Sequence, residues 1–246
     1  MRPFGELIAA RVVATLWRMW RELIVGLNLP PAGEILLAGE DVANIELPVG
    51  AGTRVEAGQL VLVTRSRTLP ADAAPTATGL DADSLDLVIL RDAAGSVPNL
   101  RRVLAESYRI LKPGAGVMVI EFDAATLLDS RPQQYPQLLL SNMYPSVGEY
   151  LLHRHPRQMD IGMALVKAGF KDGDSYSLDL PLGHFHDHQT YVDSVAVEGW
   201  RGMEQLSAEQ LDNLLDQLPG LMKAVAPAGE FDDLEPTTVA RAYKPD

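Results

Sequence analysis

The sequence predicts an α/β domain of Rossmann-like type, with a mostly parallel sheet flanked by helices and an added N-terminal helix. Two continuous apolar runs, residues 87–90 and 117–120, indicate strands covered on both faces. Between them, residues 99–111 place apolar side chains at helical spacing, and Pro113-Gly114 cannot continue that helix. A strand, a helix and a strand in this order favour parallel strands joined by a right-handed crossover.

The bulk composition excludes several classes of protein. The 246 residues are 47% hydrophobic and 22% charged, which is ordinary for a globular chain of one α/β domain. The net charge of −12 would repel a phosphate backbone, so no nucleic-acid partner is expected. There are no cysteines, which excludes disulfides and thiolate metal sites. With no long apolar span and no signal-peptide pattern, the expected location is the cytoplasm.

Two motifs in the central stretch carry a family resemblance. The chain reads DADSLDLVIL from residue 81 and LRRVLAESYRILKPGAGVMVIEFD from residue 100. This pattern resembles class I S-adenosylmethionine-dependent methyltransferases, with the ubiquinone/menaquinone-biosynthesis enzymes as the most similar group. The closing VARAYKP, from residue 239, is similar to the last strand of that family, which inserts antiparallel beside the sixth. The resemblance covers residues 80–245 and implies S-adenosylmethionine as cofactor if the protein is active.

The first half departs from the family pattern. The strand at 34–38 should run into a glycine-rich turn, but only Gly39 is present and Glu40 follows it. Residues 39–82 are too few for the two βαβ units that the family has there, and the strand at 60–64 ends without the acid that grips the adenosine ribose. We therefore expect that at least one cofactor-side helix is shortened or replaced, and that cofactor binding is lost or weakened.

Candidate site residues follow from strand ends and from the resemblance. Arg91 and Asp92 follow the fourth strand, where loops line the ligand crevice of open α/β sheets; an internal Arg–Asp pair in a solvated loop is the alternative. If the protein is active, Gly39, Glu40, Arg91, Asp92 and Gly95 are the predicted cofactor contacts. Under that hypothesis, methyl transfer proceeds by orientation in a dry pocket.

The candidate general bases, and the segment expected over the acceptor, come next. Asp92, His153 and His186 are the predicted bases. Residues 127–156 contain several prolines and three tyrosines and are expected to be irregular. The resembled enzymes carry an insertion here, so this segment is either a lid over a small apolar or aromatic molecule or an ordinary packing excursion.

A group of histidines follows the sixth strand, which is expected at 175–180 after a helix at 158–168. His184, His186 and His188 would share one face if the strand continued through them, and could then bind a divalent metal. A solvated histidine-rich turn is the commoner arrangement, and no metal site is predicted here. Residues 207–225 are predicted to form a helix with a capping box, interrupted near Pro219-Gly220, before the last strand at 237–243.

The N-terminal residues 1–28 are predicted to form a segment separate from the methyltransferase-like domain at 29–246. An apolar stripe at 3.6-residue spacing runs through 4–27, and Trp17 and Trp20 lie beside it. This amphipathic helix would cover the sheet or a partner protein; the alternative is peripheral contact with an anionic membrane.

Three functional hypotheses remain open from the sequence. The first is a methyltransferase-fold protein with lost or weakened S-adenosylmethionine binding and a retained small-molecule or protein-binding role. The second is an active methyltransferase on a small, quinone-like or aromatic acceptor. The third is a non-catalytic assembly subunit that uses its N-terminal helix.

Overall fold

The computed structural model describes residues 33–39, 53–57, 60–64, 67–93 and 95–246. The described residues form two compact units. The sheet unit comprises the described residues up to Phe122, together with His155–Leu178 and Thr237–Asp246. The helical unit comprises Asp123–Arg154 and Asp179–Pro236. The helix predicted at 4–27 lies outside the described residues.

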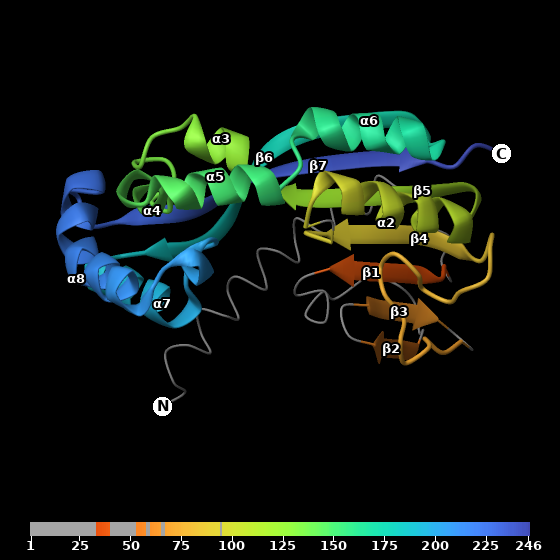
Figure 1. Cartoon of the computed structure of the whole chain (residues 1–246), viewed down its shortest axis with the longest axis horizontal. Helices are drawn as coiled ribbons and strands as arrows, with labels where there is room; N and C mark the ends of the chain where they lie inside the picture. The colour runs from red at the N-terminus through yellow and green to blue at the C-terminus, as the bar shows by residue number, and fades with distance from the viewer. Residues whose placement is uncertain (1–32, 40–52, 58–59, 65–66, 94) are drawn as a thin grey trace. The chain divides into compact units, whose positions relative to one another are not determined.

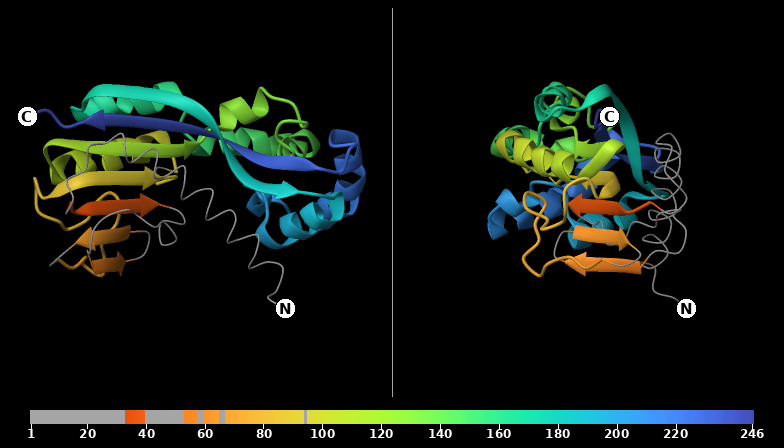
Figure 2. Two further views of the ribbon diagram at one scale, coloured as in Figure 1. Left: turned by 180° about the vertical axis from the view of Figure 1, so that it is seen from behind. Right: turned by 90° about the vertical axis from the view of Figure 1, so that its right-hand side faces the viewer.

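The chain forms a seven-stranded sheet with strand order β2-β3-β1-β4-β5-β7-β6 (Figures 1 and 2). The strands are β1 (Ile35–Gly39), β2 (Thr53–Ala57), β3 (Leu60–Thr64), β4 (Leu85–Arg91), β5 (Leu111–Phe122), β6 (Lys171–Phe185) and β7 (Phe231–Tyr243). The carboxyl-terminal part of β6 and the amino-terminal part of β7 belong to the helical unit. The Rossmann-like α/β class predicted from the sequence is confirmed.

The three central strands are parallel, as their continuous apolar sequences predict. Leu36 of β1 pairs with Val88 of β4, and Val88 pairs with Val117 of β5. All three side chains are buried, because both faces of these strands are covered. β7 pairs antiparallel with β5 and lies between β5 and β6, which confirms the predicted antiparallel closing strand.

Two helices cover one face of the central strands. α2 (Val97–Ile110) and α6 (Gln158–Ala168) pack on each other and share one apolar core with β1, β4 and β5. α2 begins where the Ser96 hydroxyl accepts a hydrogen bond from the Asn99 amide, which satisfies a donor at the helix start. α6 ends at Gly169, whose φ of 101° lies in the left-handed region that glycine adopts most easily.

The turn predicted at Pro113-Gly114 is instead a bulge inside β5. Leu85 pairs with Leu111 and Leu87 pairs with Gly116, so the intervening residues of β5 bulge out of the ladder. Gly114 has φ +75° and its amide donates to the Lys244 carbonyl. The helix ends at Ile110, one residue before the predicted end, and Pro113 cannot continue it.

The first half of the sheet ends in an antiparallel hairpin, which departs from a parallel arrangement. β3 pairs antiparallel with β1 through Leu36 and Leu62, and β2 pairs antiparallel with β3. Thr64 at the end of β3 therefore lies at the amino-terminal edge of β1, where its hydroxyl donates to Glu34. The end of β3, where the family resemblance would place a ribose-binding acid, therefore lies at the edge of the sheet opposite to the carboxyl end of β1.

The segment predicted to be irregular at 127–156 contains three short helices, so that expectation was wrong. They are α3 (Ala124–Leu128), α4 (Leu138–Met143) and α5 (Pro145–Arg154). Pro145 opens α5 at a position where the missing amide hydrogen is not needed. The hydroxyls of Tyr135 and Tyr144 donate to Asp179 and to the Gln210 carbonyl, so these tyrosines anchor elements within the helical unit.

The rest of the helical unit is α7 (His188–Glu198), η2 (Met203–Gln205) and α8 (Ala208–Val225). The predicted Ser207 capping box is confirmed, but α8 continues through Pro219 without the predicted interruption. Among the described residues, no helix combines the length and apolar content required to cross a membrane.

Candidate functional site at the carboxyl edge of the sheet

The carboxyl ends of β1, β4 and β5 meet at one edge of the sheet unit. Gly39 pairs with Arg91, and Arg91 pairs with Ile120, which directly precedes Glu121. In open α/β sheets this edge is where ligands bind. The structure therefore brings Gly39, Arg91, Asp92 and Glu121 to the edge that the sequence predicted for the site.

Gly39 makes a close main-chain contact with β4. Its φ is +123°, and a Cβ at this position would lie 1.7 Å from the Arg91 carbonyl oxygen. Glycine is therefore required here by the neighbouring strand, because any larger residue would clash with backbone atoms. The side of Gly39 that a side chain would occupy faces Arg91 and is not open to a ligand.

Asp92 is fixed to β5 by two hydrogen bonds. Its amide donates to the Ile120 carbonyl at 2.9 Å, and its Oδ1 accepts from the Phe122 amide at 2.9 Å. Its φ of 47° is in the left-handed region, where aspartate is tolerated better than most residues. Asp92 thus has a structural role in joining the ends of β4 and β5, whatever else its carboxylate does.

A buried acid–histidine pair lies beside Asp92. The Glu121 carboxylate and the His155 ring are both buried, and Glu121 Oε2 lies 4.0 Å from His155 Nδ1. The His155 ring also meets Phe122 edge to face, with ring centroids 5.0 Å apart. The pair thus places a carboxylate and an imidazole side by side in the interior of the sheet unit, at the edge where ligands bind.

Asp92, Glu121 and His155 form a compact set of ligand atoms. One donor atom from each lies within 4.8 Å of the others. Such a set can exchange protons or hold a polar or cationic ligand group. We call these three residues the edge cluster.

The other predicted cofactor contacts are not part of the edge cluster. Arg91 is the buried last residue of β4. Gly95 is exposed, has φ +58° and leaves open space where a Cβ would be. Glu40 lies outside the described residues.

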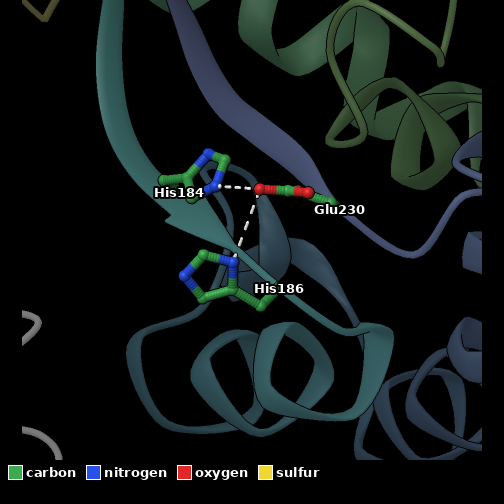
Figure 3. Close-up of side chains that lie close together, drawn as sticks. All are labelled: His184, His186 and Glu230. Atoms are coloured by element: carbon green, nitrogen blue, oxygen red, sulfur yellow. Dashed lines mark hydrogen bonds and ion pairs between the residues drawn. The ribbon is translucent and has the colours of Figure 1, made fainter.

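The two predicted histidine bases belong to the helical unit. His153 is exposed on α5, where its Nδ1 is 2.7 Å from the Glu149 carbonyl one turn earlier. His186 follows β6 and lies beside His184 and Glu230 (Figure 3). Neither histidine is therefore a member of the edge cluster.

The predicted histidine triad is only partly assembled. β6 ends at Phe185 and α7 begins at His188, so the three histidines do not share one strand face. His188 Nε2 instead lies 2.6 Å from the Ala226 carbonyl, and its ring stacks near Phe231. The carboxylates of Asp232 and Glu230 raise the pKa of His184 by hydrogen bonding to both of its ring nitrogens.

Sequence reasoning did not select His155 or Glu230 as site residues. Glu121 was expected at the end of the fifth strand, on the rim of the site, but it was not assigned a role. His155 stands in an Arg-His-Pro run before a helix, and its only signal was its place after the segment 127–154. Glu230 lies 44 residues or more from its histidine neighbours in sequence, so only the strand pairing brings it close.

Comparison with known proteins gives one family match. Residues 49–120 match the model of a methyltransferase domain, Methyltransf_11. The ubiquinone/menaquinone biosynthesis C-methyltransferase UbiE of Pasteurella multocida is 26% identical over 169 residues, which cover 63% of this chain and 60% of that protein. UbiE of Haemophilus ducreyi is 26% identical over 117 residues, covering 42% of this chain and 44% of its own length. The chain thus spans less than two thirds of either relative.

Solved structures align at low similarity. The YcgJ protein of Bacillus subtilis aligns with a TM-score of 0.42 and 13% identity over 75% of this chain and 72% of its own. Phosphoethanolamine N-methyltransferase 2 of Haemonchus contortus, with S-adenosyl-L-methionine bound, gives a TM-score of 0.37 and 16% identity over 70% of this chain and 36% of its own. The matched domain model and the two sequence relatives support the resemblance of this chain to class I S-adenosylmethionine-dependent methyltransferases.

Proposed function

We propose that this protein has a methyltransferase fold with lost or greatly weakened S-adenosylmethionine binding, and that it retains a binding role for a small molecule or a protein. The observation that carries this proposal is the direction of β3. Its amino end, Leu60, pairs with Ala38 at the carboxyl end of β1. A parallel neighbour would instead bring its carboxyl end there, with the acid that grips the adenosine ribose in this family.

A second observation concerns the turn after β1. In this family the glycines after the first strand allow the cofactor to approach the backbone. Here the bare side of Gly39 packs against the Arg91 carbonyl oxygen. This contact leaves no room for a ligand on that side of Gly39, which supports the proposal of weakened cofactor binding, and we derive no catalytic step through the cofactor.

The alternative is an active S-adenosylmethionine-dependent methyltransferase on a small, quinone-like or aromatic acceptor. It is favoured by the edge cluster, because Glu121 and His155 place a buried carboxylate and a buried imidazole, the usual side chains of general bases, at the edge where ligands bind. Both sequence relatives are ubiquinone/menaquinone biosynthesis C-methyltransferases, which also favours a quinone-like acceptor. A non-catalytic assembly subunit, acting through residues 4–27, is the remaining proposal.

Calorimetry of the full chain with S-adenosylmethionine and S-adenosylhomocysteine tests the first proposal. We expect no heat of binding up to about 1 mM ligand, which corresponds to less than ~4 kcal/mol of binding free energy. A dissociation constant near 1 μM, about −8 kcal/mol, would contradict the first proposal and support the active enzyme. Circular dichroism on the same sample must show folded protein, so that absent binding is not a consequence of unfolding.

A pull-down with and without residues 1–28 separates the remaining proposals. Loss of a bound protein upon truncation would support the assembly subunit. A cytoplasmic location is proposed with each of these functions, and the absence of cysteines supports it.

A further inference from the structure

Two histidines and a glutamate converge on the surface of the helical unit. His184 Nε2 lies 2.9 Å from Glu230 Oε1, and His186 Nδ1 lies 3.5 Å from the same oxygen. One donor atom of each residue lies within 4.8 Å of the others. Figure 3 shows both rings turned toward the Glu230 carboxylate, between the end of β6 and the start of β7.

The backbone beneath these residues is anchored in a core. Phe185 lies between the two histidines in sequence and is buried, with its ring centroid 4.8 Å from that of Tyr191 and 5.8 Å from that of Phe231. Alternating residues of an extended chain point to opposite sides, so burial of Phe185 directs His184 and His186 outward together. Phe231 directly follows Glu230, and thus the same aromatic contact holds the third residue in place.

A fourth side chain orients one of the rings. Asp232 Oδ1 lies 2.7 Å from His184 Nδ1. Without a metal, both ring nitrogens donate to carboxylates. When a metal replaces the proton on Nε2, the Asp232 carboxylate keeps a proton on Nδ1, and the lone pair of Nε2 is directed toward the metal. Histidines that bind metals commonly have such a carboxylate behind them, which fixes the ring and its tautomer.

We propose that His184, His186 and Glu230 bind a divalent first-row transition metal ion such as Zn²⁺, with Asp232 supporting His184. Two imidazole nitrogens and one carboxylate oxygen suit zinc, nickel or copper better than magnesium or calcium, which prefer oxygen ligands. Tetrahedral zinc with bonds of ~2.0–2.1 Å separates its ligand atoms by about 3.3 Å. The donor separations of 2.9 and 3.5 Å bracket that value.

The proposed ligands differ from the three histidines that the sequence suggested as a metal site. His188 is held by the Ala226 carbonyl and by Phe231, so it does not contribute. Glu230 replaces it as the third ligand. Water molecules would complete the coordination, because His184, His186 and Glu230 are all exposed.

Titration of the full-length, tag-free protein with ZnCl₂ by calorimetry tests the site. We expect one ion per chain with a dissociation constant near 1 μM. His184→Ala and His186→Ala should each weaken binding at least about tenfold, and Asp232→Asn should weaken it by about 10–100-fold through the support of His184. Glu230→Gln keeps the shape of the side chain and should also weaken binding about tenfold.

His153→Ala is the matched control, because His153 is another exposed histidine of the helical unit. It should bind zinc as the wild type does. The proposal is overturned by no binding up to about 100 μM zinc, or by binding that the His184 and His186 variants leave unchanged. Circular dichroism of each variant must match the wild type, so that lost binding is not lost folding.

Discussion

The carbonyl oxygen of Arg91 occupies the space that a side chain on residue 39 would need, at 1.7 Å from the ideal Cβ position of Gly39. The parallel strands β1 and β4 therefore meet backbone to backbone at the carboxyl edge of the sheet. The glycine that the sequence suggested as a remnant of a cofactor loop is required by strand packing. This relationship gives the first prediction.

Gly39→Ala should destabilise the fold by about 3 kcal/mol, because it combines a backbone clash with a positive φ. Urea unfolding followed by circular dichroism measures the change. Gly95→Ala is the matched control, since Gly95 also has positive φ but has open space around it. It should cost only about 1 kcal/mol. Equal losses in the two variants would show that the contact with Arg91 does not matter.

Asp92→Ala should destabilise the protein by about 2 kcal/mol, because the Phe122 amide loses its acceptor at the end of β5. Asp92→Asn keeps an acceptor oxygen and tolerates the left-handed φ, so it should stay within about 0.5 kcal/mol of the wild type. Chemical unfolding of the two variants side by side distinguishes them. An alanine variant as stable as the asparagine variant would rule out the proposed joining of β4 and β5.

Glu106 should contribute to stability at neutral pH and lose that contribution in acid. Partial burial raises the pKa of this carboxyl, but hydrogen bonds from Arg109 and Thr78 outweigh burial and lower the pKa to about 2. Because the folded pKa lies below the unfolded value, the stabilisation is present above pH ~4.5 and is lost as the pH falls toward 2.

The urea midpoint, measured from pH 6 to pH 2, checks this prediction. Glu106→Gln should lower the midpoint at pH 6 and should show a smaller decrease in acid than the wild type. Parallel curves for the two proteins would mean that Glu106 is not the group responsible.

Asp233 should have the opposite pH dependence. Burial raises its pKa to about 7, and the nearby carboxylates of Glu235 and Glu198 add to the increase, against a hydrogen bond from Tyr191. The folded state therefore retains a proton that the unfolded chain has released. Its contribution to stability is complete below pH ~3.9 and is lost as the pH rises to 7, with a slope of at most about 1.4 kcal/mol per pH unit.

Asp233→Asn removes this titration, because the amide is neutral at every pH. The difference in unfolding free energy between wild type and variant should shift in favour of the variant between pH 4 and pH 8. Using the difference cancels the other titrating groups that the two proteins share. A difference that does not change with pH would show that Asp233 titrates normally.

Much of the sheet unit was predictable from local sequence. The runs at 87–90 and 117–120 are parallel neighbours, and α2 lies between them in the sequence. Both features were predictable because apolar periodicity indicates which faces of an element are covered. The helices within 127–156 were not predicted, since each is short and prolines obscured the pattern. The bulge at Pro113-Gly114 was predicted as a turn, because a glycine with left-handed φ occurs both in tight turns and in β-bulges.

The candidate site was predictable only in part. Asp92 and Gly39 follow strands, so their edge of the sheet follows from strand order. The pairing of Glu121 with His155, and of Glu230 with His184 and His186, joins residues distant in the chain. Periodicity contains no information about such contacts.

By itself, the sequence determined the class of fold, the central strand–helix–strand unit and the methyltransferase resemblance, because these depend on local patterns of apolar residues, glycine and proline. Only the tertiary structure decided that β3 runs antiparallel to β1. A parallel and an antiparallel β3 would have the same apolar sequence. The direction depends on how the chain connects β3 to its neighbours and not on the residues of the strand itself. The same holds for the edge cluster and the histidine–glutamate site, which exist because distant strands bring their ends together.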